Sequence, residues 1–389
     1  MTSAPQLRLR HFAPLLAATG LLVSCDTPQK RALRELAKAG IEPSGNALLQ
    51  AVAAQDARQA GWLLEVGVYT EQRDLYGRTP VRIAIENGDL PIVFKLLDAH
   101  ANVNATADDQ VGPLGIAVER GETAVVEKLL TAGARTDGPM RDGEKILPWA
   151  IRKGRLSFVR AMMKSGADPH LCDRAGNPLL HVAMESGRRD LVESLIELGA
   201  DPGATNAAGE TTLQLAFRHG WLDAVPKLAA AGADPNARGS EGLTLLDQAV
   251  AAGDPQQISL LLEIGADPNA RGTGQSPLEI VFGKADPMLF QMFLDRGAKP
   301  PEGNWNAWLW QAFAAGNLPA ARLLLASGAR ATHPGPGGAL LLEKAAAAGR
   351  GSFVKLLADH GSPPGQALYQ ACARGDHDMA ALLISCGAP

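Results

Sequence analysis

The stretch that decides the fold reads Gly176-Asn177-Pro178-Leu179-Leu180-His181-Val182-Ala183, and it recurs in altered form as Gly77-Arg78-Thr79-Pro80-Val81-Arg82-Ile83-Ala84. Each copy places a turn before a short apolar helix, and proline is tolerated in the first turn of a helix. We expect this first helix to stop at a glycine, because glycine suits the left-handed residue that closes a helix. Such glycines recur along the chain: Gly88, Gly121, Gly154, Gly187, Gly220, Gly253, Gly316, Gly349 and Gly375.

A second feature, glycine followed by alanine, recurs at steps of 33 residues at Gly133, Gly166, Gly199, Gly232 and Gly265. The series extends back to His100 and Gly67, and forward with small slips to Gly297, Gly328 and Gly361. Before each of these residues, a second helix carries apolar pairs one turn apart, such as Val125-Val126 and Leu129-Leu130. Only neighbouring helices can cover so broad an apolar stripe.

A period of this length is typical of proteins built from stacked repeats. The sequence therefore predicts an all-α repeat solenoid, with about eleven helix pairs joined by short β-turn fingers. Thr27-Pro28 has the residue types of an N-cap and first helical position, so a further helix is expected from about Gln29 to Ala39.

The 33-residue pattern resembles the ankyrin repeat, whose hallmark is a G-x-T-P-L-H-x-A-A motif followed by a glycine and a helix with leucine pairs. The resemblance covers about residues 31–388 and implies a non-enzymatic module that presents a concave surface to a protein partner. The family's histidine is retained as a structural residue at His181. Elsewhere Arg82, Gln214, Asp247 and Trp310 replace it, so its bracing hydrogen bonds must be replaced or lost. Pro226 departs from the pattern, and we expect it to kink a second helix between Leu222 and Ala230.

In the ankyrin family, turn tips and the exposed end of the first helix bind partners. By register, the partner-binding candidates are Arg73, Tyr76, Arg78, Glu86, Asn87, Arg120, Arg152, Lys153, Glu185, Arg218 and His219. The same register adds Leu75, Asp108, Glu119, Arg141, Arg174, Arg238, Glu241 and Arg271. Five of these side chains should form a mainly basic stripe that binds an acidic protein segment: Arg120, Arg152, Lys153, Arg218 and His219. The alternative is that each of these side chains is only a solvated charge.

The beginning of the chain has the proportions of an export signal. Basic residues precede an apolar run from Phe12 to Val23, which is too short to span a bilayer. The run ends in Leu22-Val23-Ser24-Cys25, which resembles the lipobox of bacterial lipoproteins. This implies a signal peptide over 1–24, lipid on Cys25, an anchor linker over 25–28 and a solenoid over 29–389. The protein would face the periplasm or exterior from a membrane of the bacterial cell envelope. An ordinary cleaved secretory signal is the alternative.

Composition and motifs predict no enzymatic activity, cofactor, metal or small-molecule substrate. A net charge of −4 gives no global attraction to nucleic acid. The eight histidines lack metal-ligand spacing, and there is no phosphate-binding loop or nucleophile elbow. The paired carboxylates Asp108-Asp109 are expected at a turn tip, where acidic residues favour the backbone geometry. The alternative to a recognition module is a structural spacer or assembly scaffold in the envelope.

Two further groups leave open alternatives. Trp305, Trp308, Trp310 and Phe313 form either an enlarged core or an aromatic anchor for a partner. Cys172 is expected to be exposed at an outer turn, either as a free thiol or paired with a partner. Cys372 and Cys386 are expected to lie too far apart for a disulfide.

Overall fold

The computed structural model describes residues 27–239, 241–272, 274–284, 286–300, 304–335 and 338–387. The predicted signal peptide over 1–24 and the predicted lipid attachment at Cys25 lie outside the described residues. The chain divides into two compact units, unit 1 over residues 1–168 and unit 2 over residues 169–389.

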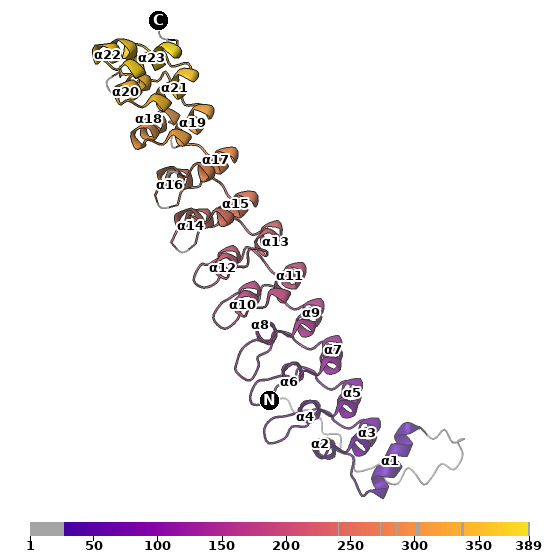
Figure 1. The fold of residues 1–389 in the computed structure, drawn as a ribbon. Helices are drawn as coiled ribbons and strands as arrows, with labels where there is room; N and C mark the ends of the chain where they lie inside the picture. Colours follow the sequence, from indigo (N-terminus) through magenta and orange to yellow (C-terminus); the bar gives the residue numbers. More distant parts are fainter. Residues whose placement is uncertain are drawn as a thin grey trace. The chain divides into compact units, whose positions relative to one another are not determined.

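The helices of unit 1 are α1 Pro28–Lys38, α2 Gly45–Ala53, α3 Ala57–Val66, α4 Pro80–Asn87, α5 Leu90–Asp98, α6 Pro113–Arg120, α7 Thr123–Thr131, α8 Ile146–Arg152 and α9 Leu156–Lys164. The first helices of successive pairs, α2, α4, α6 and α8, each pack against the next, and so do the second helices α3, α5, α7 and α9 (Figure 1). Helix α1 packs against α3.

The helices of unit 2 are α10 Leu179–Glu185, α11 Arg189–Glu197, α12 Thr212–Arg218, α13 Val225–Ala230, α14 Leu245–Ala252, α15 Pro255–Glu263, α16 Pro277–Gly283, α17 Pro287–Asp295, α18 Trp305–Ala315, α19 Leu318–Ala326, α20 Leu341–Ala347, α21 Gly351–Asp359, α22 Ala367–Ala373 and α23 His377–Ser385. Each first helix packs against the second helix that follows it. Contacts between successive pairs include α10 with α12, α14 with α16, and α17 with α19.

The prediction of an all-helical repeat fold is confirmed over the described residues, which contain no β-strand. At three turns, single antiparallel bridges close the finger, between Pro139 and Lys145, Cys172 and Pro178, and Thr205 and Thr211. These three fingers are therefore turns held by one bridge rather than strands of a sheet.

The helix ends follow from local residue types. Thr27 caps α1 by accepting a hydrogen bond from the Lys30 backbone N–H, with proline in the first turn, as the sequence predicts. Every glycine predicted to close a first helix has a positive φ, for example 75° at Gly88. At the glycine–alanine position that follows the second helix of a repeat, His100 replaces glycine and still adopts a φ of 57°. A non-glycine residue is strained in that conformation.

The core consists of the predicted apolar pairs. In α7, Val125, Val126 and Leu129 have no exposed surface, and Leu130 is 8% exposed. Because neighbouring helices cover this stripe on both sides, burial in each pair depends on the presence of the next one.

The prediction of a kink at Pro226 is wrong. Helix α13 begins only at Val225, so Pro226 lies in its first turn, where its missing N–H has no partner to lose. Residues 222–224 form a turn instead, held by a hydrogen bond from the Ala224 N–H to the Trp221 carbonyl oxygen. Proline has shortened the helix to six residues rather than bent it.

The aromatic residues of α18 differ in burial, since Trp308 is buried whereas Trp305, Trp310 and Phe313 are half-buried. Trp308 is 7% exposed and stacks on Phe282, with ring centroids 4.6 Å apart. Phe313 meets Phe353 edge to face at 5.4 Å. The core interpretation therefore holds for Trp308, whereas Trp305 is half-buried.

The thiol at the outer turn is also more enclosed than expected. Cys172 is half-buried rather than exposed, and its backbone pairs with Pro178 in the bridge that closes its finger. The described cysteines Cys172, Cys372 and Cys386 are all free thiols.

Candidate interaction surface

Arg82 occupies the position that His181 has in its own repeat, and its side chain makes the bracing contacts between repeats there. Its side chain is only 4% exposed. It makes a bidentate pair with Asp109 at 2.6 and 2.5 Å and donates to the Val111 carbonyl oxygen at 2.7 Å. Asp109 and Val111 belong to the finger of the next repeat, so the guanidinium fastens one repeat to its neighbour. The hydrogen bonds from Arg82 hold the pKa of Asp109 below its ordinary value near 3.8.

The finger before α4 is organised by Asp74. Its carboxylate accepts hydrogen bonds from the backbone N–H groups of Tyr76 and Arg78, at 2.9 and 2.8 Å, as aspartate does in tight turns. The Arg78 side chain returns to the same carboxylate at 2.7 Å. Burial by itself would raise the pKa of Asp74, but these hydrogen bonds outweigh it and lower the pKa.

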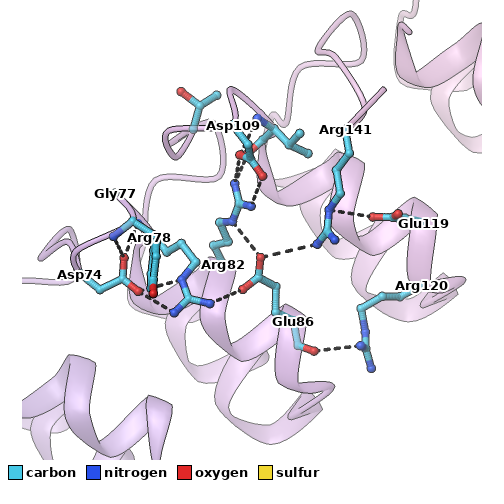
Figure 2. A network of polar contacts seen from close by, with 12 residues as sticks. Asp74, Gly77, Arg78, Arg82, Glu86, Asp109, Glu119, Arg120 and Arg141 are labelled. Carbon is cyan, nitrogen blue, oxygen red and sulfur yellow. Dashed lines mark hydrogen bonds and ion pairs between the residues drawn. The ribbon is translucent and has the colours of Figure 1, made fainter. Parts of the chain in front are cut away.

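Glu86 connects these groups at the end of α4 (Figure 2). Its carboxylate pairs with Arg82 and Arg78, both at 3.0 Å, and with Arg141 at 3.8 Å. Its backbone carbonyl oxygen accepts a hydrogen bond from Arg120 at 2.8 Å. Three consecutive repeats of unit 1 thus meet at one glutamate, beside an open groove of 450 Å³.

The tip of this finger carries exposed apolar side chains. Leu75 is 97% exposed and Tyr76 is 66% exposed, and the Arg78 guanidinium lies 5.1 Å from the Tyr76 ring centroid. The ion pairs to Asp74 and Glu86 fix this guanidinium, so the ring has a stable support. A large, rigid aromatic side chain in such a place is suited to contact another protein.

The remaining candidates of unit 1 also make local contacts. Arg73 donates to the carbonyl oxygens of Gly77 and Thr106, and Asn87 donates to that of Val52 at 3.3 Å. Arg152 pairs with the buried Glu144 at 2.7 Å. Lys153 lies over the Trp149 ring, 5.9 Å from its centroid. The contacts of Arg73, Asn87 and Arg152 hold these side chains in place on the surface.

In unit 2, Arg218 bridges two carboxylates, Glu185 at 2.9 Å and Glu210 at 3.0 Å. His219 follows it and lies beside Trp221, with ring centroids 6.0 Å apart. The three arginines predicted to form a basic stripe, Arg120, Arg152 and Arg218, all have carboxylate partners. Because these partners compensate the positive charge, the local surface is less basic than the sequence suggests.

His181 has the structural role that the sequence predicts. It has no exposed surface, and its Nε2 lies 2.9 Å from the Glu210 carbonyl oxygen. Since a carbonyl oxygen only accepts, Nε2 must carry the proton. Burial lowers the pKa of His181, which keeps the ring neutral.

Sequence reasoning missed several members of these clusters, above all Asp74, Arg82 and Asp109. Asp109 stabilises its own turn by accepting a hydrogen bond from the Val111 N–H at 3.1 Å, as the sequence suggests. It is also the ion-pair partner of Arg82. The sequence did contain a signal for this contact, because Arg82 is a charged residue at the position where the repeat pattern has histidine. It could not identify the partner, because Asp109 lies 27 residues away.

Within the described residues no three His, Cys, Asp or Glu side chains gather as metal ligands would. None of the helices in the described part of the chain has the length and apolar character needed to cross a membrane.

Comparison with known proteins identifies ankyrin repeats within the chain. The family model for ankyrin repeats, which spans three copies, matches residues 83–173, 114–206 and 180–272. A search of curated proteins found no match. Among solved structures, the chain is similar to the ankyrin repeat domain of Bcl-3, described as a unique member of the IkappaB protein family. That similarity has 28% identity and a TM-score of 0.46, and covers 52% of this chain and 94% of the other.

A second similar structure is EF0377, an ankyrin repeat protein, with 26% identity and a TM-score of 0.42 over 49% of this chain and 98% of the other. The match to the ankyrin-repeat model comes from the sequence, and the repeated helix pairs come from the structure, and both indicate the same repeat. The chain therefore contains ankyrin repeats, which the family model matches over residues 83–272.

Proposed function

We propose that this protein is a non-enzymatic interaction module, a lipoprotein of the bacterial cell envelope that presents its turns and first helices to a protein partner. Ankyrin repeats are generally protein–protein interaction modules. We further propose that the array consists of about eleven helix pairs. The observation that carries the proposal is the finger tip at Leu75 and Tyr76, where apolar side chains are exposed above a network of ion pairs.

Exposure of Leu75 and Tyr76 is hard to explain by folding alone. Neither side chain covers the core, and burial of exposed apolar surface is favourable. Binding hot spots are enriched in tyrosine, and the prior ordering of Arg78 reduces the entropy lost when a partner binds. The finger therefore suits a partner that covers both side chains.

A crosslinking pulldown from membranes tests the function. The wild-type protein should retain one dominant protein at defined stoichiometry, and Leu75→Ser with Tyr76→Ser should reduce its recovery at least fivefold. Asp201→Ser, in a turn of unit 2, serves as the control and should leave recovery unchanged. Absence of any stoichiometric partner would favour a spacer or scaffold.

The lipid anchor needs a separate test. We expect Cys25→Ala to move the protein out of the membrane fraction, and metabolic labelling with a fatty acid to mark only the wild type. Equal labelling of both proteins, or of neither, would contradict the anchor without bearing on the binding surface.

The acidic partner expected from the sequence stays a prediction. Arg152→Glu with Lys153→Glu should weaken its binding at low salt, where screening of charges is least. Unchanged affinity in this variant, at unchanged helicity, would remove both residues from the binding surface.

A further inference from the structure

A groove of 580 Å³ lies in unit 2 between α12 and α14. Its lining includes four apolar residues among polar ones: Phe217, Leu245, Ala249 and Ala252. The two alanines are three residues apart, so they lie on the same side of α14. Because their side chains end at Cβ, they leave open volume in the groove that Phe217 also lines. A space of this kind takes an aliphatic or aromatic side chain.

Amide groups line the same groove. Gln248 and Gln257 contribute to it. The backbone N–H of Gln257 donates to Asp254, but neither side-chain amide has a hydrogen bond to the residues that the structure describes. An amide both donates and accepts, so it can bind the main-chain N–H and carbonyl groups of an extended peptide. The groove therefore offers one apolar recess with polar groups beside it.

The charge of the groove is negative. Arg218 lines it, but its guanidinium is already held by Glu185 and Glu210. Glu241 also lines it, is exposed, and has no ion pair within the described ranges. Arg238 is not among the residues that line the groove, and its guanidinium donates to the carbonyl oxygens of Gly242 and Arg271. Glu241 is thus the charge that a ligand can neutralise.

We propose that this groove binds a peptide segment that inserts an apolar side chain next to a lysine or arginine. The apolar side chain fills the recess above Ala249 and Ala252, and the basic residue pairs with Glu241. Gln248 and Gln257 bind the peptide backbone. The proposal rests on the proposed interaction function and assigns the ligand class of one site on that surface.

Selection from a displayed library of random 12-residue peptides on the full chain tests the proposal. Enriched sequences should share an apolar residue adjacent to lysine or arginine. Synthetic peptides of that sequence, measured by fluorescence anisotropy, should bind Ala252→Trp at least tenfold more weakly, because the indole fills the recess. Glu241→Lys should weaken binding about three- to tenfold at low salt and less at high salt, where charges are screened.

Two matched variants control for general effects. Ala315→Trp places the same side chain at the same position of α18, directly before the closing glycine, and should leave affinity unchanged. Asp359→Lys makes the same charge reversal on an exposed carboxylate at the end of α21 and should also leave the peptide affinity unchanged. Circular dichroism should show unchanged helicity in all four variants.

Three results would overturn the proposal: no enriched peptide, an acidic consensus, or equal affinity for Ala252→Trp and the wild type. The partner recovered by pulldown separates this inference from the broader function. If that partner binds Ala252→Trp and Glu241→Lys as well as the wild type, the groove proposal fails and the interaction function stands. If no partner is recovered but the selected peptides bind the groove, the groove proposal stands and the proposed interaction function loses its support.

Discussion

Asp247 lies so close to Gly272 that a Cβ on the glycine would stand 2.7 Å from the aspartate Oδ2. Asp247 occupies the position that His181 has in its own repeat, and Gly272 belongs to the finger of the repeat after Asp247. The same relation recurs between Glu343 and Gly365, also at 2.7 Å from the added Cβ. Adjacent repeats are thus joined where one side chain enters a space that glycine leaves.

Gly272→Ala should destabilise the protein. Asp247 is 5% exposed and is held in a capping box with Thr244, so it cannot move aside easily. Overpacking of this kind costs about 1–3 kcal/mol. Urea denaturation should show a lower midpoint, and hydrogen exchange should place the loss in α14 and the following finger.

Gly283→Ala serves as the control for Gly272→Ala. A Cβ at Gly283 would meet nothing within 4 Å, and this residue is helical. Replacement of a helical glycine by alanine stabilises by roughly 0.5–1 kcal/mol. A similar loss of stability in both variants would mean that the contact with Asp247 has no special role.

His100→Gly should stabilise the protein. His100 is exposed and has a φ of 57°, whereas Gly67 and Gly133 occupy the same position in the flanking repeats. The left-handed conformation costs a non-glycine residue about 1–2 kcal/mol, part of which glycine loses again through chain entropy. We expect a net gain of roughly 0.5–1 kcal/mol, measured by urea denaturation. Gly133→His should shift the midpoint in the opposite direction, and an unchanged midpoint in both would exclude strain at this position.

Stability should fall as the pH drops below about 6.5, because of His181. Its pKa in the folded protein is lowered from the ordinary value of 6.5, so the unfolded chain binds the proton more readily. The neutral, buried ring is therefore fully stable above that pH, and stability is lost as the pH falls toward the folded pKa. The slope for one such proton is at most about 1.4 kcal/mol per pH unit.

His181→Gln isolates this pH effect. The chain already has glutamine at the same repeat position in Gln214, and the amide can donate to the Glu210 carbonyl oxygen as Nε2 does. Thermal unfolding between pH 5 and 7 should show a weaker pH dependence in the variant than in the wild type. Identical pH dependence would assign the effect to other groups.

Arg82→Leu should be more damaging than removal of either carboxylate. It leaves Glu86 and Asp109 without their shared cation and the Val111 carbonyl oxygen without its donor. Loss of these charged hydrogen bonds should cost about 2–4 kcal/mol. Asp109→Asn should cost less than about 1 kcal/mol, because the Asp109 side chain is 40% exposed and solvent screens its charge. Urea denaturation of the two variants and of the double variant provides the coupling energy.

The sequence by itself determined the helices, their ends and their order. Apolar pairs at 125–126 and 129–130 specify a buried helix, and glycines such as Gly88 end one, because both effects act within a turn or two of the chain. Even so, local reasoning placed Pro226 inside a helix. That interpretation had the second helix already formed from about Leu222, whereas α13 begins only at Val225, so that Pro226 lies in its first turn.

Tertiary structure alone decided which side chains face one another across repeats. Arg82 and Asp109 are 27 residues apart, and only stacking brings the finger of one repeat onto the helix of the one before it. Stacking also brought Glu185 of the preceding repeat to Arg218, and it placed Phe217 of one repeat in the same groove as Ala249 and Ala252 of the next. Charge compensation and open volume depend on distances between neighbours, which the periodicity of a sequence does not contain.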